Sequence, residues 1–543
     1  MKSANRSIPA VNFVTPFDRL VTGAQTVTTT TIDRSTFKGI VCGSRHLTHE
    51  AFQNDVRRAA AGFTGMGVEP GDCVGIFMRN DIPFLTASQA ANYVGAYAVP
   101  INWHLVGEEL TYILNDCGAK VLVIHADLWR AIHEAIPESV KCLVVETHED
   151  VGNAFGLDPQ ACKVPEGLTN WSQWLQGQQP ITGPAQAGLS SMLYTSGTTG
   201  HPKGVRRFAL DEEKAALMRD FRSRVYGCAP GARCVVPGPL YHSAPNGYSM
   251  QASRISDLLV IVPRFDAESL LQLVEEYRLT AGMLVPIMFI RMLKLADDVR
   301  NRCDLSSLEF IIHAAAPCPA DVKRRMIEWF GPVIYEFYGS TESGAVVACN
   351  SAQALSKPGS VGKPVPEASV RILDEDGNVL PANAIGEIYS RFPMNDFTYN
   401  GRPEARAEIE RDGHITSGDM GYMDEDDFLF IADRVKDMVI SGGVNIYPAE
   451  IEAVLHNYPG IKDCAVFGVP DEEFGEAVMA VLEVESEDSI SLDEVRVYLR
   501  EHLAGFKVPR TIETGKDLPR EDSGKIFKRR LRDKYWQLAG RKI

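Results

Sequence analysis

Short apolar runs alternate with segments of helical spacing along most of this 543-residue chain, and this alternation limits the possible folds more than any other feature. Runs with the length and composition of buried strands occupy residues 73–78, 120–124, 308–312 and 333–337. Between such runs lie segments like 107–116, whose apolar residues recur at helical spacing. Alternation of this kind over hundreds of residues favours α/β layers with parallel sheets. We therefore predict an α/β fold.

The last hundred residues have a different pattern and predict a second domain. One hydrophobic core rarely organises a chain of this length, so at least two domains are expected. Pro448 stands where a first helical turn tolerates proline, and strand-like runs follow at 464–469 and 478–482. We predict a large N-terminal domain of residues 1–433 and a small α+β domain of residues 434–543.

The charge balance and the cysteine pattern exclude several classes of partner. The chain carries 71 acidic and 55 basic residues, a net charge of −16, so on average it repels nucleic acid and anionic membrane surfaces. Its 11 cysteines are scattered without the spacing of a metal or redox site, which suits a reducing compartment. Neither a signal-peptide core nor an apolar stretch of about 18 residues is present. We expect a cytoplasmic protein without an integral membrane segment.

The segment 194–205 (YTSGTTGHPKGV) is the strongest functional signal in the sequence. A strand-like run ends there in a loop of hydroxyl and glycine residues, and Lys203 follows the loop. Glycines let the backbone approach an anion, hydroxyl groups donate hydrogen bonds and the lysine adds a positive charge, as triphosphate binding requires. The order of residues is not that of a Walker A loop. The alternative, a flexible surface turn, accounts less well for the lysine and the flanking strand.

Two further segments supply groups that suit the rest of a nucleotide. In the run YEFYGSTESG, Tyr338 offers an aromatic face for a base, and Glu342 offers oxygen atoms of the kind that Mg²⁺ prefers. In the run TSGDMG, Asp419 can accept hydrogen bonds from ribose hydroxyl groups, and Arg434 can reach the same sugar or a phosphate. Taken singly, these segments are equally compatible with polar turns and salt-bridged loops.

A fourth segment, 518–528 (LPREDSGKIFK), lies near the C-terminus and is rich in basic residues. Lys525 follows Gly524 directly, so a turn rather than the middle of a helix presents it. A solvated basic face is the ordinary alternative for such a run. The segment therefore indicates function only in combination with the other three.

Together and in this order, the four segments resemble the adenylate-forming enzymes, the superfamily of acyl- and aryl-CoA synthetases, peptide-synthetase adenylation domains and luciferases. The resemblance extends from about residue 47 to the C-terminus, and the segments 440–452 and 467–470 are most similar to the acyl-CoA synthetase, fatty-acid–CoA ligase-like branch. It implies an N-terminal domain of layered sheets with a β-barrel-like subdomain, and a C-terminal domain that moves between half-reactions. It also implies that ATP, Mg²⁺ and coenzyme A take part.

The resemblance assigns roles to residues that match the family motifs. It implies catalytic roles for Lys525, Glu342, Thr195, Lys203 and His242, with Glu342 and Thr195 also near the metal. Contacts to the nucleotide or to coenzyme A are implied for Ser196, Gly197, Thr198, Thr199, Gly200, Ala315, Ala316, Tyr338, Gly339, Thr341, Asp419, Arg434, Lys436, Gly442 and Gly443. An acyl pocket is implied for His242, Asn246, Gly247, His313, Ala314 and Gly339.

Three of these assignments carry the two-step logic. Lys525 would bridge the substrate carboxylate and the ATP phosphates, Lys436 would be the hinge, and Gly442 would line the entry of the thiol together with its neighbour. His242 would be a gate beside the acyl pocket, although a hydrogen-bonded core histidine is its plain alternative. The segment 313–318 (HAAAPC) departs from the family pattern, which changes the floor of the acyl pocket.

The substrate and the acyl acceptor are the least determined features. Small residues in the pocket wall favour a bulky or long apolar acid, whether fatty, alicyclic (terpenoid or steroid) or aromatic. No Arg or Lys stands at an obvious pocket end, which argues against dicarboxylic acids. Coenzyme A is the expected acceptor, while a separate carrier protein and a non-catalytic acyl-adenylate sensor remain as alternatives. Small-molecule acid, ATP and coenzyme A are thus the expected partners, nucleic acid is not, and a homodimer is compatible with the sequence.

Overall fold

A parallel sheet in the order β4-β3-β5-β6 forms the first layer of the fold. The structure is a computed structural model that describes residues 32–186, 189–195, 202–434, 437–441, 444–471, 474–484, 490–520 and 526–538. The strands of this sheet are β3 (Cys73–Phe77), β4 (Tyr97–Pro100), β5 (Ala119–His125) and β6 (Lys141–Val145). The helices of this part are α1 (His49–Gly65), α2 (Ile82–Tyr93), α3 (Glu108–Cys117), α4 (Ala126–Ile132), α5 (Glu149–Phe155) and α6 (Trp171–Gln176).

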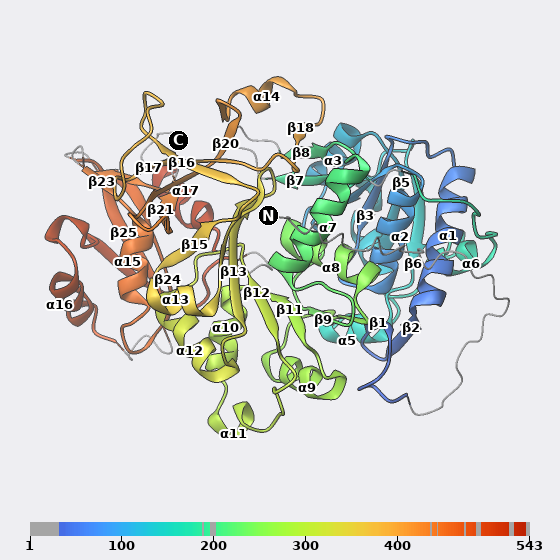
Figure 1. The fold of residues 1–543 in the computed structure, drawn as a ribbon, viewed down its shortest axis with the longest axis horizontal. Helices are drawn as coiled ribbons and strands as arrows, with labels where there is room; N and C mark the ends of the chain where they lie inside the picture. Colours follow the sequence, from blue (N-terminus) through green and yellow to red (C-terminus); the bar gives the residue numbers. More distant parts are fainter. Residues whose placement is uncertain are drawn as a thin grey trace, which may run out of the picture.

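A second, larger sheet runs through the middle of the molecule and combines a parallel and an antiparallel part (Figure 1). Its parallel strands are β1 (Gly39–Cys42), β10 (Leu258–Ile261), β9 (Arg233–Val236), β11 (Ala281–Leu284), β12 (Phe310–His313) and β13 (Ile334–Ser340). β2 (Arg45–Thr48) closes one edge in antiparallel orientation. The helices that follow these strands are α8 (Ser243–Ile255), α9 (Ala267–Tyr277), α10 (Pro286–Leu293), α11 (Asp297–Arg300) and α12 (Ala320–Phe330).

The antiparallel part of the central sheet begins after β13. It consists of β14 (Gly344–Cys349), β15 (Ser360–Pro364), β16 (Ser369–Leu373), β17 (Gly386–Arg391), β19 (Glu410–Arg411), β20 (His414–Met423) and β21 (Leu429–Arg434), with α13 (Ser351–Ser356) and α14 (Glu404–Ala407) between strands. The sequence predicts a β-barrel-like subdomain in this region. In the structure these strands continue the central sheet, because β14 pairs with β13 on one side and with β15 on the other.

Helices α2 and α8 lie between the two sheets, which explains why both are buried. One core cluster contains Val74 of β3, Phe84 of α2, Ala252 of α8 and Val236 of β9. Because α2 contacts apolar neighbours on both sides, it shows almost no polar face. Each fully buried large apolar side chain in such a layer contributes about 1.5–3 kcal/mol to stability.

The C-terminal part has its own sheet and its own core. The sheet is formed by β22 (Val439–Ser441), β23 (Val444–Ile446), β24 (Ile461–Asp471), β25 (Gly475–Val484) and β26 (Thr511–Gly515), and the helices are α15 (Pro448–Leu455), α16 (Leu492–His502) and α17 (Lys528–Leu538). Val439, Ile451 and Leu482 belong to a separate hydrophobic cluster. The α/β fold with a smaller C-terminal domain, predicted from the sequence, is thereby confirmed. The predicted boundary at residues 433 and 434 falls at the end of β21.

Among the described helices, none combines the length and the apolar character that a membrane crossing requires.

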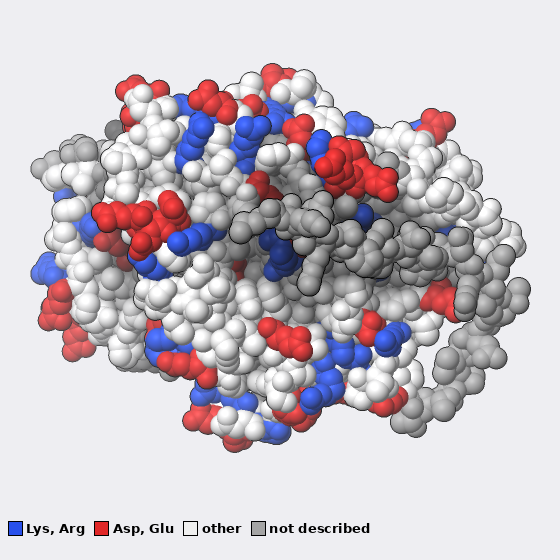
Figure 2. Space-filling view, in the orientation of Figure 1, with Lys and Arg blue, Asp and Glu red and all other residues white. Residues whose placement is uncertain are grey.

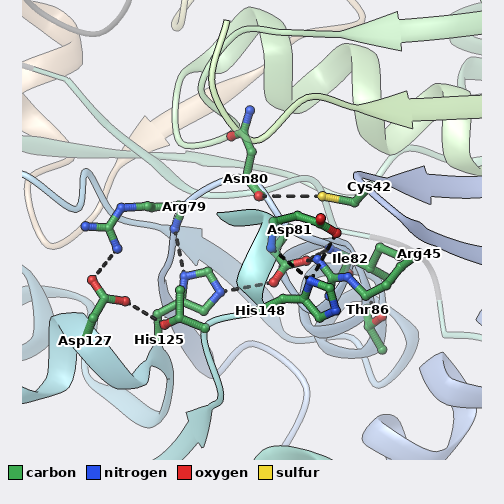
Figure 3. A network of polar contacts seen from close by, with 12 residues as sticks. Cys42, Arg45, Arg79, Asn80, Asp81, Ile82, Thr86, His125, Asp127 and His148 are labelled. Carbon is green, nitrogen blue, oxygen red and sulfur yellow. Dashed lines mark hydrogen bonds and ion pairs between the residues drawn. The ribbon is translucent and has the colours of Figure 1, made fainter. Parts of the chain in front are cut away.

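Asp81 organises a buried polar network at the carboxyl end of β3 (Figure 3). Its carboxylate accepts a hydrogen bond from the backbone N–H of Ile82 at 2.7 Å and thereby caps the start of α2. It also forms an ion pair with Arg45 and lies 3.2 Å from Nε2 of His125. Burial alone would raise the Asp81 pKa, but the hydrogen bond with His125 and the charge of Arg45 outweigh it, so the pKa lies below its ordinary value.

The neighbouring Asn80 connects the two sheets. Its side-chain Nδ2 donates to the carbonyl oxygens of Gly238 at 2.9 Å and Val262 at 3.0 Å, directly after β9 and β10. Its Oδ1 accepts from the backbone N–H of Leu240 at 2.8 Å. Asn80 therefore fixes the chain segment that leads from β9 to His242 and α8.

We predict that Asp81→Asn lowers the free energy of unfolding by about 3 kcal/mol at pH 7, because it removes one partner of a buried ion pair. The carboxylate has a lower pKa in the folded than in the unfolded chain, so its contribution is present above the unfolded pKa of about 3.9 and is lost as the pH falls through the folded value. Urea unfolding between pH 3 and pH 7 measures this, with the exposed Asp298→Asn as control. A loss that is constant over this range would contradict the ionic contribution.

Candidate active site

The segment that the sequence predicts as a phosphate loop is flanked by a hairpin. β7 (Leu193–Thr195) and β8 (Lys203–Arg207) are antiparallel, with Thr195 opposite Lys203. β18 (Phe397–Tyr399) pairs with the other edge of β8, so the three strands form a small sheet of their own. The hairpin thus sets the positions of a hydroxyl and an ammonium group at the two ends of the loop.

Glu342 joins the first two motifs. Its Oε1 accepts hydrogen bonds from Thr195 Oγ1 at 3.3 Å and from Tyr399 Oη at 3.0 Å. Asn395 Nδ2 donates to the Glu342 backbone carbonyl at 2.7 Å. Within the described part of the chain, Oε2 of Glu342 takes part in no hydrogen bond or ion pair. A carboxylate held by one oxygen while the other stays open fits the coordination of Mg²⁺, which the family resemblance implies.

Among the described residues, Lys203 has only a distant carboxylate partner. Its Nζ lies 3.9 Å from Glu408 Oε2 and 5.3 Å from the centroid of the Tyr399 ring. The lysine side chain is 10% exposed, whereas that of Glu408 is 64% exposed. An ammonium group that is almost enclosed and so weakly paired is available to a phosphate, which would be a closer counter-ion.

Tyr338, Asp419 and Arg434 form a connected group. Tyr338 Oη donates to Asp419 Oδ2 at 2.8 Å, and Arg434 Nε lies 3.3 Å from Asp419 Oδ1. Asp419 and Arg434 face each other across β20 and β21. Ser417 Oγ also donates to Asp419 Oδ2, at 3.0 Å. Burial and the Asp419 charge raise the Tyr338 pKa, so the phenol stays protonated and remains the donor.

The segment after β12, which contains the predicted nucleotide-contact residues Ala315 and Ala316, adopts a strained turn. Ala315 has φ of +74°, in the left-handed region that non-glycine residues seldom adopt. The conformation costs about 1 kcal/mol in an alanine. Ala315 is exposed and Ala316 is half-buried.

The predicted acyl-pocket residues fall into two groups. His242 is the N-cap residue of α8, with its ring 4.4 Å from that of Tyr241, and a Cβ added to Gly247 would meet no neighbouring atom. Asn246 instead points into the fold, where its Nδ2 donates to the Leu240 carbonyl at 2.9 Å. At Gly339 a Cβ would collide with the carbonyl oxygen of Gly344, so a crossing backbone, not pocket space, requires this glycine.

His313 is completely buried next to an ion pair. Its Nδ1 lies 3.9 Å from Glu336 Oε1, and Glu336 is paired with Lys323. Neither ring nitrogen of His313 has a hydrogen-bond partner. Burial and the Lys323 charge hold the His313 pKa well below its ordinary value, so the ring is neutral. Ala314, the next residue, is also buried.

Other predicted site residues lie outside the described part of the chain. They are Ser196, Gly197, Thr198, Thr199, Gly200, Lys436, Gly442, Gly443 and Lys525.

Comparisons with known proteins show which family the chain resembles. Residues 25–396 match the AMP-binding enzyme family, and residues 450–525 match the AMP-binding enzyme C-terminal domain. A feruloyl-CoA synthase of an Amycolatopsis species is 34% identical over 508 residues, which cover 91% of this chain and 95% of that protein. A long-chain-fatty-acid–CoA ligase of Mycobacterium tuberculosis is 30% identical and covers 90% and 93%. The ATP-bound structure of MatB from Rhodopseudomonas palustris superposes with a TM-score of 0.78 at 27% identity, over 93% and 97% of the two chains.

The chain belongs to the AMP-binding enzyme family. Within this adenylate-forming superfamily it falls in the acyl-CoA synthetase branch, and it is an AMP-forming acid–thiol ligase. The superfamily membership expected from the four motifs is thereby confirmed. The roles of the individual residues stay predictions, which the geometry above makes specific.

Sequence reasoning missed two groups in this AMP-binding enzyme site. Tyr399 contacts both Glu342 and Lys203, and Arg207 donates to the backbone carbonyl of Thr341. Neither residue lies in a segment with a recognisable pattern of its own. The pairing of β18 with β8 brings Tyr399 to the site, and no local sequence signal specifies that pairing.

We predict that Tyr399→Phe lowers kcat/KM for ATP about tenfold, because Glu342 loses a charge-assisted hydrogen bond that orients it. The Mg²⁺ concentration that gives half-maximal pyrophosphate release should rise, which a purely structural role would not cause. Tyr389→Phe is the matched control, since that hydroxyl lies 3.4 Å from Glu387 and does not contact Glu342. An unchanged Mg²⁺ dependence in Tyr399→Phe would contradict the positioning role.

Proposed function

We propose that this protein is an acid–CoA ligase that activates a carboxylic acid with ATP and transfers the acyl group to coenzyme A. The observation that carries the proposal is the convergence of Thr195, Lys203 and Glu342, which come from motifs far apart in the chain. A polar surface turn without a ligand does not require a hydroxyl group, an ammonium group and a carboxylate with one unbonded oxygen to lie together.

In the first half-reaction, a substrate carboxylate oxygen attacks the α-phosphorus of ATP. The bond from that phosphorus to the bridging oxygen breaks, and pyrophosphate leaves with the electron pair. Lys203 would hold the phosphates, and Glu342 with Thr195 would hold Mg²⁺, which supplies charge neutralisation on the phosphate oxygens. Asp419 and Arg434 would orient the ribose.

In the second half-reaction, the thiolate of coenzyme A attacks the carbonyl carbon of the acyl-adenylate. The bond from that carbon to the phosphate oxygen breaks, AMP leaves and a thioester remains. The thiol proton passes to solvent. Lys525 would serve only the first step, and movement about Lys436 would bring Gly442 and Gly443 to the thiol.

For the acid, the proposal is a bulky or long molecule. Gly247 supports it, because α8 presents open space there rather than a packed neighbour. The sequence-based expectation that the acid is apolar remains a prediction.

The decisive experiment measures pyrophosphate release from MgATP with fatty, alicyclic, aromatic and dicarboxylic acids, with and without coenzyme A. We expect release with at least one class, together with AMP and a CoA thioester. Release without a thioester would replace coenzyme A with a carrier protein as acceptor. No release with any acid would contradict the ligase proposal and favour a nucleotide sensor.

We predict that Lys525→Ala slows acyl-adenylate formation about 100- to 1,000-fold while sparing thioester formation from preformed acyl-adenylate, because a cation that stabilises developing charge is lost in one step only. Single-turnover assays of the two half-reactions measure this. Lys516→Ala, which removes an exposed lysine of the same domain, is the control. Equal loss in both steps would show that Lys525 does not have this role.

A further inference from the structure

Three arginines next to the candidate active site form no ion pair with an acidic residue in the described part of the chain. They are Arg207 on β8, Arg222 on α7 (Glu212–Tyr226) and Arg254 on α8. Arg207 donates to the Thr341 carbonyl, and Arg254 Nη2 donates to Asn92 Oδ1 at 3.4 Å.

The charge of Arg222 acts on both of the other arginines. Burial, and after it the charge of Arg222, lowers the pKa of both Arg207 and Arg254 to about 10. Burial also lowers the pKa of Arg222 itself. Cations without counter-ions in such surroundings destabilise the folded protein, unless an anion occupies the space between them.

Arg254 combines an exposed side chain with surroundings that lower its pKa. Figure 2 shows basic side chains gathered in the middle of this face, beside the region that α7 and α8 occupy in Figure 1. A side chain that lines a binding pocket is both accessible to solvent and surrounded by protein.

One face of α8 links the predicted acyl pocket with this cationic group. Gly247, Gln251 and Arg254 are spaced by four and three residues, so they share a side of the helix. A Cβ at Gly247 would meet open space, and Gln251 is 4% exposed with no hydrogen-bond partner for its Nε2. Beyond the gate position His242, this face therefore offers hydrogen-bond donors and positive charge.

We propose that the acid activated by this enzyme carries a second carboxylate, which Arg222, Arg254 and Gln251 bind at the far end of the acyl pocket. This inference rests on the proposed ligase function and deepens it. A guanidinium group binds a carboxylate through two parallel hydrogen bonds, and a buried amide N–H₂ adds a further donor.

The helix also limits the length of the acid. Gly247 and Arg254 are about 10 Å apart along the axis of α8. A second carboxylate that reaches Arg254 therefore belongs to an elongated dicarboxylic acid and not to one with only a few carbons. The motif segments place no Arg or Lys at an obvious pocket end, which argued against dicarboxylic acids. Arg222 and Arg254 lie in helices outside those segments.

The test compares dodecanedioic acid with its monomethyl ester and with dodecanoic acid, using pyrophosphate release at saturating MgATP. We expect wild-type enzyme to prefer the diacid. Arg254→Met and Arg222→Met should each lower kcat/KM for the diacid about 10- to 100-fold. Their rates with the monoester should change little, which also shows that the variants are folded. Arg219→Met, which removes an exposed arginine of α7, is the matched control and should behave like wild type.

Several outcomes would overturn the inference. One is an equal rate of pyrophosphate release with the diacid and with its monoester in the wild-type enzyme. A loss of equal size for diacid and monoester in the Arg254 variant is another. A raised KM for coenzyme A with unchanged diacid kinetics would reassign the arginines to the coenzyme phosphates. Absence of release with every acid would overturn the ligase function and this inference together, whereas the other outcomes leave the ligase function intact.

Discussion

The side-chain amide of Asn80 forms three hydrogen bonds to backbone groups beyond β9 and β10, and the arrangement of the two sheets depends on them. Backbone polar groups just beyond a buried strand need hydrogen-bond partners, because each unpaired group lowers the stability of the fold by about 1–3 kcal/mol. One amide satisfies all three and at the same time joins the end of β3 to the central sheet. Asp81, directly after it, caps α2, which fills the layer between the sheets. Because this junction leads to His242, the packing of the core also sets the start of the acyl pocket.

The candidate active site is assembled from segments that lie far apart in the sequence. Thr195 and Glu342 are 147 residues apart, and one hydrogen bond of 3.3 Å connects them. Tyr338 and Asp419 are joined in the same way across 81 residues. Thr195 is the last residue of β7 and Glu342 lies in the turn between β13 and β14, whereas Tyr338 lies in β13 and Asp419 in β20. The sheet therefore fixes the distances between polar groups, and the loops between its strands supply the groups that meet ligands.

The parts of the fold that were predictable from the sequence are those whose pattern is local. Strands such as β3 and β5 are buried on both faces, so their apolar runs mark them within one or two residues. The motif around Lys203 was recognisable because charge, glycines and strand lie together. Tyr399 and Arg254 were not, because each acts through a neighbour that only the folded chain brings close. The crossing backbone that requires a glycine at position 339 was not predictable either, since sequence cannot distinguish an empty position from one crowded by a crossing backbone.

The two glycines Gly247 and Gly339 leave different freedom for substitution. A Cβ added at Gly247 would meet no atom within 4 Å, so we expect small substitutions there to be tolerated and to change which acids fit. Gly339 cannot vary in this way, because a Cβ there would collide with backbone atoms. Ala315 cannot either, because its backbone is in the left-handed region, where a larger side chain would be strained. Substrate range in descendants of this chain would thus diversify along α8, while the nucleotide side stays constant.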